Sequence, residues 1–126
     1  MVVGTSVGAW VGSFVSSFAK KDGREMADFI VDGWLSLNPE DILTPFSDDL
    51  FHLGKYNIYH RQEMIKDMLT DLIPDGKFKR KYSIGVTEMK LNLEYRAINV
   101  NELSETDGLE AASILISASG ALPALF

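Results

Sequence analysis

Residues 1–19 contain no charged side chain, and their hydrophobic pattern changes from that of a strand to that of a helix at Val7. Val2 and Val3 form a short β-branched run that a glycine ends. Apolar residues then recur at helical spacing along a single stripe: Val7, Trp10, Val11, Phe14, Val15 and Phe18. The pattern predicts a strand, a tight turn and a packed helix within residues 2–19.

An uncharged N-terminal segment is also found in signal peptides and membrane anchors, and both interpretations are disfavoured here. No Lys or Arg precedes the apolar run, and no small-x-small cleavage site closes it, although a signal peptide needs both. The run is at the short limit for a spanning helix and contains three Gly and five Ser or Thr residues. We expect a cytoplasmic protein that is able to contact a membrane surface peripherally.

The composition excludes several classes of site. The chain has 126 residues, 46% of them hydrophobic, which is enough for one domain with a buried core. The absence of Cys excludes a disulfide framework, a Cys-ligated zinc site and a thiol nucleophile. Two His residues are too few for a His-rich metal site, and a net charge of -6 argues against nucleic-acid binding. We expect no cofactor, no metal and no nucleic-acid partner, and the oligomeric state stays open.

The rest of the chain alternates between helical and strand patterns. Helical spacing predicts three further helices, near residues 22–37, 61–73 and 108–118. Alternation with period two predicts two strands, near residues 81–87 and 91–100. Residues 40–60 predict a short helix and an irregular loop, and residues 102–107 predict an acidic loop. Strands that alternate with helices indicate an α/β layered fold with a largely parallel sheet.

The segment Gly4-Thr5-Ser6-Val7-Gly8 matches G-x-S-x-G at the junction of the first predicted strand and helix. This is the context of a nucleophile elbow, in which a sharp turn lifts the Ser hydroxyl above the strand end and the glycines avoid clashes. The N–H of Val7 at the helix N-terminus can then stabilise an oxyanion. We predict that Ser6 is the nucleophile, exposed and with a strained backbone, and that Gly4, Val7 and Gly8 form the elbow. The alternative is a glycine-rich turn with no catalytic role.

A nucleophilic Ser needs a base, and no residue fits this role clearly. His52 and His60 lie mid-chain, whereas the His of an α/β-hydrolase follows the acid late in the domain. Asp-Gly pairs begin at Asp32, Asp75 and Asp107. Their positions are typical of a helix interior, a helix-stopping turn and a helix cap. The catalytic base is therefore not identified in this chain.

One basic cluster, residues 77–81, allows two interpretations. It holds three Lys and one Arg within five residues, and such a cluster is able to contact anionic lipid head groups. It also fits a solvated lead-in to the strand near residues 81–87. The spacing of these residues does not decide between the two.

Two motifs of the chain are similar to those of a known family. Residues 4–9, Gly-Thr-Ser-Val-Gly-Ala, resemble the elbow G-T-S-x-G-A of the patatin-like phospholipase family. Residues 118–126, Ala-Ser-Gly-Ala-Leu-Pro-Ala-Leu-Phe, are similar to its A-S-x-A-x-P segment and the Phe that soon follows. The paired extended segments between the two motifs resemble the paired strands that the family has before its second motif. The likeness covers nearly the whole chain, and its first motif is the more specific.

The resemblance implies a three-layer α/β/α fold and a serine lipid acyl hydrolase that acts on lipid or acyl-ester substrates. In its Ser–Asp dyad, Ser6 would attack the ester carbonyl and an Asp would take its proton. The Asp does not carry over, because the family places its D-G-G or D-G-A after the A-S-x-A-x-P segment. The family's Gly-rich oxyanion segment would precede Met1. We therefore expect residues 1–126 to be the interior of a patatin-like domain, incomplete at both ends and weakly active or inactive alone.

Two other functions stay open. The chain could be a non-catalytic remnant or lipid-surface binding module that keeps the middle of the fold. It could also be an acyltransferase, since one acyltransferase fold uses a G-x-S-x-G elbow. That enzyme would have a His in the motif and a second His as base, and Thr5 argues against it.

Overall fold

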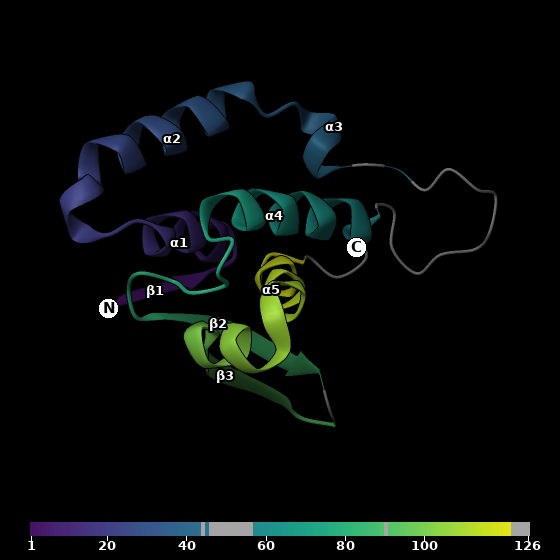
Figure 1. Ribbon diagram of the computed structural model, residues 1–126. Coiled ribbons are helices and arrows are strands. Elements are labelled where there is room, and N and C mark those ends of the chain that lie inside the picture. Colours follow the sequence, from purple (N-terminus) through teal and green to yellow (C-terminus); the bar gives the residue numbers. More distant parts are fainter. Residues whose placement is uncertain (44, 46–56, 90, 122–126) are drawn as a thin grey trace.

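A computed structural model describes residues 1–43, 45, 57–89 and 91–121. Figure 1 shows the elements in chain order. They are β1 (Val2–Thr5), α1 (Val7–Ser17), the 3-10 turn η1 (Lys20–Asp22), α2 (Gly23–Ser36), α3 (Pro39–Ile42), α4 (Ile58–Leu72), β2 (Tyr82–Met89), β3 (Leu93–Asn99) and α5 (Val100–Ser119).

The three strands form one sheet in the order β1-β2-β3. β1 runs parallel to β2, with Val2 opposite Tyr82, and the helices α1 to α4 make the crossover between them. β2 runs antiparallel to β3, with Ser83 opposite Asn99. The link between β2 and β3 is too short for a crossover, so the two strands form a hairpin. The α/β class is confirmed, as is a shared sheet of Val2, Val3 and both later segments, and the sheet is parallel in part.

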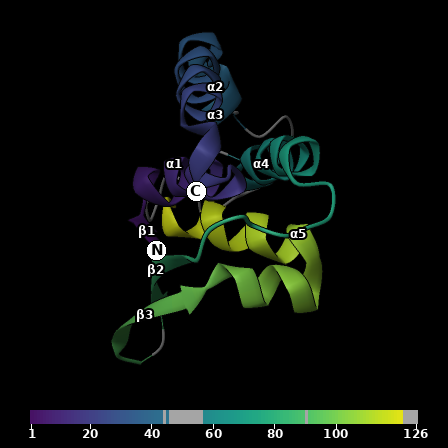
Figure 2. The ribbon, with the colours of Figure 1, turned by 60° about the vertical axis from the view of Figure 1, so that its left-hand side comes forward.

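The helices pack on one face of this sheet. Tyr82 and Ile84 alternate along β2 toward that face and are fully buried, whereas Val3 and Tyr95 point the other way and are exposed. The buried apolar core is shared by β2, three helices and the link between α4 and β2: Ala9, Trp10, Phe14, Ile65, Leu69, Ile73, Phe78, Tyr82, Ile84, Val100, Ala112 and Ile116. In the described part of the chain, helices therefore form a layer on one face (Figure 2), where the resemblance implies layers on both.

The predicted helices are present, with changes at their ends. α2 matches its prediction, and α4 begins earlier because the Asn57 side chain accepts from the N–H of Tyr59 and caps it. The acidic loop predicted at residues 102–107 is wrong, since this segment forms the first half of α5. The Asn99 side chain caps that half, and Gly108 breaks the helix with φ 83°. The irregular loop predicted within residues 40–60 lies largely outside the described residues.

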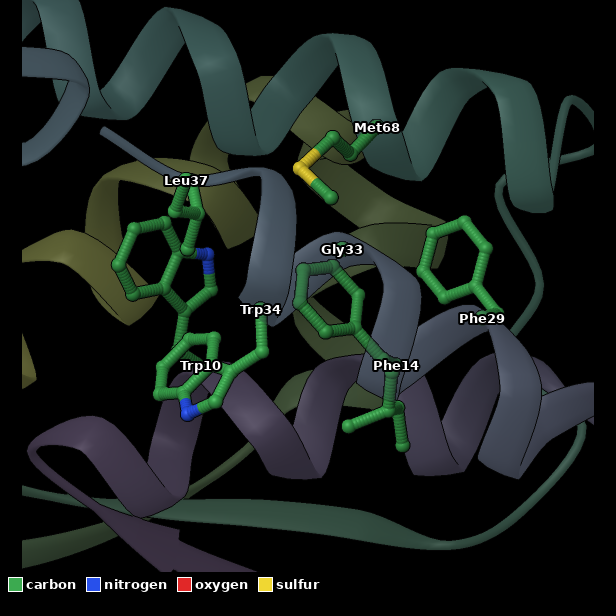
Figure 3. Close-up of a pocket in the computed structure, with 8 residues that line it drawn as sticks. Trp10, Phe14, Phe29, Gly33, Trp34, Leu37 and Met68 are labelled. Carbon is green, nitrogen blue, oxygen red and sulfur yellow. The ribbon is translucent and has the colours of Figure 1, made fainter.

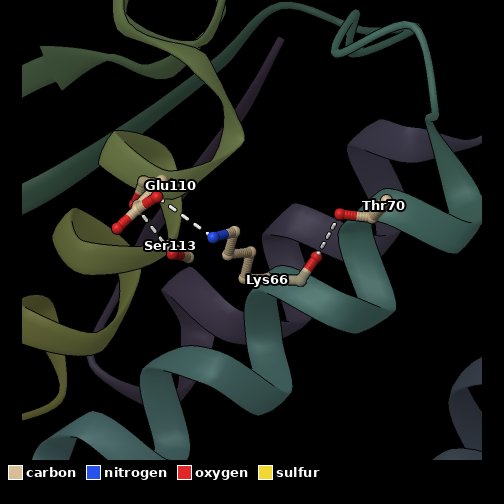
Figure 4. A network of polar contacts seen from close by, with 4 residues as sticks. All are labelled: Lys66, Thr70, Glu110 and Ser113. Carbon is tan, nitrogen blue, oxygen red and sulfur yellow. Dashed lines mark hydrogen bonds and ion pairs between the residues drawn. The ribbon is translucent and has the colours of Figure 1, made fainter.

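An ion pair joins α4 to α5 at the surface, and a hydrogen bond within each helix lies beside it. Lys66 on α4 and Glu110 on α5 form an ion pair of 3.0 Å (Figure 4). Ser113 donates a hydrogen bond to the carbonyl of Glu110, and Thr70 donates one to that of Lys66. An exposed pair of this kind contributes little to stability, so the buried residues hold the two helices together.

A buried tyrosine fixes α1 on the sheet. The hydroxyl of Tyr82 donates to the carbonyl of Ala9, and its ring lies against Gly12, where a Cβ would be 3.0 Å from the ring. Helix α1 therefore leaves the strand at a fixed distance and angle. That placement decides where the residues between β1 and α1 lie.

The buried tyrosine makes stability depend on pH in the alkaline range. Burial raises the pKa of the Tyr82 phenol, whereas a tyrosine in the unfolded chain ionises near about pH 10. Above that pH the unfolded chain loses a proton that the folded chain keeps, so the free energy of unfolding falls as pH rises, by at most about 1.4 kcal/mol per pH unit. In urea denaturation between about pH 8 and pH 11, the free energy of unfolding should decline less steeply with pH for Tyr82→Phe than for the parent chain. Equal slopes for the two proteins would contradict this.

Candidate active site at the junction of β1 and α1

Ser6 lies between β1 and α1 in a sparsely populated backbone conformation. Its φ is 57° and its ψ is -128°, and it is the only non-glycine residue with positive φ in the described part of the chain. Such a conformation costs roughly 1–3 kcal/mol and persists only where the surroundings impose it. The side chain is exposed. Both the predicted position of Ser6 and its predicted backbone strain are found.

The two glycines that flank Ser6 have different roles. A Cβ built on Gly4 would lie 2.2 Å from the carbonyl oxygen of Gly8, so only glycine fits where the strand passes the first turn of α1. A Cβ on Gly8 would meet nothing within 4 Å. The expectation that both glycines avoid clashes therefore holds for Gly4, while Gly8 contributes its backbone to the contact.

The N-terminus of α1 opens at this turn. The carbonyl of Ser6 accepts from the N–H of Ala9 at 3.0 Å, and no side chain caps the helix. The N–H groups of Val7 and Gly8 lie in the first turn, where backbone donors have no partner within the helix. Together with the helix dipole they can bind a developing negative charge next to Ser6.

A second serine touches the backbone of Ser6. The hydroxyl of Ser119 accepts a hydrogen bond from the N–H of Ser6 at 3.0 Å and donates one to the carbonyl of Gly85 at 2.6 Å. Ser119 belongs to the second sequence motif and ends α5. The two motifs, 113 positions apart in sequence, therefore meet through this hydroxyl.

A buried arginine holds the same end of α5. Arg61 on α4 is 6% exposed and donates to the carbonyl of Ser117 at 2.6 Å and to that of Gly120 at 3.5 Å. Burial lowers the pKa of its guanidinium from the ordinary value, yet an Arg side chain stays charged in proteins. The sequence motifs did not identify Arg61 as a residue of the site. Its position nevertheless indicated that it is buried, because Arg61 lies four residues before Ile65 and eight before Leu69 on the buried stripe of α4.

An apolar cavity of about 190 Å³ adjoins Ser6. Its walls are mostly apolar: Trp10, Trp34, Ile42, Ile65 and Ile116. Ser6, Arg61 and Ser117 supply polar atoms at its edge. The shape and chemistry fit an apolar chain whose polar end lies at Ser6.

Aromatic side chains from α1 and α2 build one wall of this cavity. The rings of Trp10 and Trp34 meet edge to face, with centroids 6.1 Å apart. Beyond them, Phe14 and Phe29 pack at 5.5 Å around a second, nearly filled cavity of about 10 Å³ (Figure 3). Helix α2 therefore covers the apolar side of α1 and closes the wall above Trp10.

None of the described residues that line the Ser6 cavity is a carboxylate or a histidine. Asp75 lies at the other end of α1, since the N–H groups of Lys79 and Arg80 bind the carbonyl of Ser16 there. The N–H of Lys77 and then the ammonium of Lys79 bind the Asp75 carboxylate and hold its pKa below the ordinary value. Asp75 therefore has the structural role of a turn residue.

The other candidates for the base that the structure describes do not line the cavity either. Asp32 is exposed within α2, and Asp107 is exposed just before the break at Gly108. His60 is exposed on α4 and lines a separate open hollow with acidic residues. His52 lies outside the described residues. Among the residues that the structure describes, no group of three potential ligands could hold a metal ion.

Two members of the basic cluster have structural partners. The side chain of Arg80 donates to the carbonyls of Phe18 and Ala19 at 2.9 and 3.3 Å, where α1 ends. Lys79 is paired with Asp75 at 3.0 Å. These contacts favour the interpretation as a lead-in to β2.

Comparison with known families decides the family. The model of the patatin-like phospholipase family matches residues 1–126. The chain belongs to the patatin-like phospholipase family. The resemblance to this family is thereby confirmed, and this patatin-like chain is a member of a family of lipid acyl hydrolases. Comparison with curated proteins and with solved structures gave no match. Within the described ranges, no helix is long and apolar enough to cross a bilayer.

Proposed function

We propose that this patatin-like chain is a serine ester hydrolase that acts on acyl lipids, with Ser6 as its nucleophile. The observation that carries the proposal is the positive φ of Ser6 at the end of a strand, in front of an uncapped helix N-terminus. Strain of this kind collects at functional sites. The apolar cavity beside Ser6 supplies the second requirement, a place for the acyl chain.

The reaction divides into two transfers of the acyl group. The hydroxyl oxygen of Ser6 attacks the ester carbonyl, and the N–H of Val7 donates to the oxygen that becomes negative. The alcohol leaves with a proton, and an acyl-enzyme ester remains on Ser6. Water then attacks this ester and releases the acid.

Each transfer needs a group that takes and returns a proton. We propose a carboxylate, which would complete a Ser–Asp dyad, and we place it outside the described residues because none of the described lining residues can serve. Loss of a positioned base costs about 10²–10⁴-fold in rate. A chain in which no base reaches Ser6 is therefore expected to turn over esters slowly.

Exposed apolar side chains at the rim of the cavity support the proposal that the substrate comes from a lipid surface. Val7 and Trp34 line the cavity, yet 54% and 45% of their surfaces are exposed. Exposed apolar residues around a binding cavity favour contact with a membrane interface. This supports an acyl lipid as the substrate and a peripheral association with membranes.

A lipid-binding module without turnover is the second candidate. It is favoured by one observation, the lack of an acid or imidazole among the described residues that line the cavity. Such a module would bind the same acyl chains. It would not activate Ser6.

Labelling by a fluorophosphonate, which reacts with an activated Ser hydroxyl, tests the proposal. The chain should be labelled at Ser6, and Ser6→Ala should not be labelled. Ser36→Ala is the matched control, because Ser36 is an exposed serine at the end of α2, and it should be labelled like the parent chain. Peptide mapping by mass spectrometry locates the adduct.

Two other outcomes decide between the candidates. Equal labelling of the chain and Ser6→Ala, with a fluorescent fatty acid still bound by both, would favour the lipid-binding module. Clear turnover of a short-chain p-nitrophenyl ester that Ser6→Ala abolishes would place the base within residues 1–126. The acidic residues and the histidine of residues 46–56 would then be the first to replace.

A further inference from the structure

We propose that Ser119 is a positioning residue, whose hydroxyl holds the backbone of Ser6 in its strained conformation. The effect on catalysis rests on the function proposed above. The effect on the backbone does not, because it follows from the hydrogen bonds alone.

The amide of Ser6 needs a partner outside the sheet. The parallel ladder between β1 and β2 ends with Thr5 opposite Gly85, and the positive φ of Ser6 turns the chain away from β2. The Ser119 hydroxyl takes this N–H at 3.0 Å and gives its own proton to the carbonyl of Gly85 at 2.6 Å. A hydroxyl can do both at once, because it has one donor and two acceptor positions.

The end of α5 is fixed independently of Ser119. Arg61 donates to the carbonyls of Ser117 and Gly120, on both sides of Ser119, and hydrogen bonds from a charged donor are the stronger kind. A Cβ on Gly120 would lie 3.8 Å from the carbonyl carbon of Ser6, so this end of α5 lies against the turn itself. Removal of the Ser119 hydroxyl should therefore leave α5 in place and free only the turn.

If the turn were no longer held, two groups that take part in the reaction would move, the hydroxyl of Ser6 and the N–H of Val7. The φ and ψ of Ser6 orient its own Cβ and the peptide plane that carries the N–H of Val7. If the turn relaxes, the attacking oxygen and the oxyanion donor lose their common alignment, and small misplacements are costly in rate. The cavity walls stay as they are, so substrate affinity should change little.

The test uses three variants of the chain and two measurements. Ser119→Ala removes the hydroxyl, and Ser119→Thr keeps it, with room for its methyl group in the open hollow that Ser119 lines. Ser104→Ala is the matched control, since Ser104 lies on the same helix and donates a bond of the same length, 2.6 Å, to the carbonyl of Gly76. Amide hydrogen exchange of Ser6 is followed by ¹⁵N NMR. Fluorophosphonate labelling gives the maximal rate and the half-saturating probe concentration.

In Ser119→Ala, exchange of the Ser6 amide should accelerate about tenfold, the factor expected for a free-energy change of about 1.4 kcal/mol from one lost hydrogen bond. The maximal labelling rate should fall by a similar factor, and the half-saturating concentration should stay the same. Ser119→Thr and Ser104→Ala should exchange like the parent chain. Unchanged exchange in Ser119→Ala overturns the proposal, and so does equal acceleration in Ser104→Ala, which would mean general destabilisation. If the parent chain is not labelled at all, the proposed function fails, and the exchange data still decide the role of Ser119.

Discussion

The substitution Gly4→Ala is expected to destabilise the protein by about 1–3 kcal/mol or more and to abolish labelling of Ser6. The added Cβ would lie 2.2 Å from the carbonyl oxygen of Gly8, 2.5 Å from its carbonyl carbon and 2.7 Å from the nitrogen of Ala9. All three are backbone atoms, so no side-chain rotation relieves the overlap. Helix α1 would have to move off β1, and the turn at Ser6 would move with it. Urea denaturation measures the first effect and fluorophosphonate labelling the second.

Alanine at position 8 is the matched control. A Cβ there meets nothing within 4 Å, and Ala is a better helix former than Gly, by at most about 1 kcal/mol. Gly8→Ala should therefore be as stable as the parent chain or slightly more stable. If Gly4→Ala and Gly8→Ala destabilise the protein equally, the close contact of strand and helix at Gly4 does not explain why the motif has a glycine there.

Truncation of Leu69 should strongly destabilise the core. Leu69 on α4 is fully buried in the shared core, and Leu→Ala at such sites costs about 2–5 kcal/mol. That is a large share of the roughly 5–15 kcal/mol of a typical domain. Leu69→Ala should therefore shift the urea midpoint strongly, and labelling of Ser6 should fall because α4 also carries Arg61.

The same change on the surface provides the comparison. Leu35 on α2 is 82% exposed, so Leu35→Ala should change the free energy of unfolding by no more than about 0.5 kcal/mol. A loss for Leu35→Ala that matches the loss for Leu69→Ala would show that α2 buries this side chain in solution. The description of the core would then be wrong.

Local sequence patterns predicted the first strand, turn and helix because each of those signals lies within a few residues. A β-branched pair, a G-x-S-x-G turn and an apolar stripe fix the strand, Ser6 and α1 in turn. The charge of residues 102–107 misled the prediction, because acidic residues do not end a helix that the Asn99 side chain caps. Gly108 gave the true break, through its positive φ.

Contacts between distant residues were beyond such patterns. The hydroxyl of Ser119 meets the amide of Ser6 only because α5 turns back at Gly108 and ends beside β1. The burial of Arg61 was not predicted, since a charged residue on an apolar stripe is ordinarily assigned to the surface. The sequence patterns did not identify the base, and none of the candidate residues that the structure describes lines the cavity.

The break at Gly108 also constrains the length of the chain that follows it. Successive residues of a helix are rotated by about 100° around its axis. One residue inserted or deleted between Gly108 and Ser119 would therefore turn the Ser119 hydroxyl to another side of α5, together with the carbonyl groups that Arg61 binds. The second half of α5 acts as a spacer of defined length, and the contacts of Arg61 and Ser119 at its end set that length.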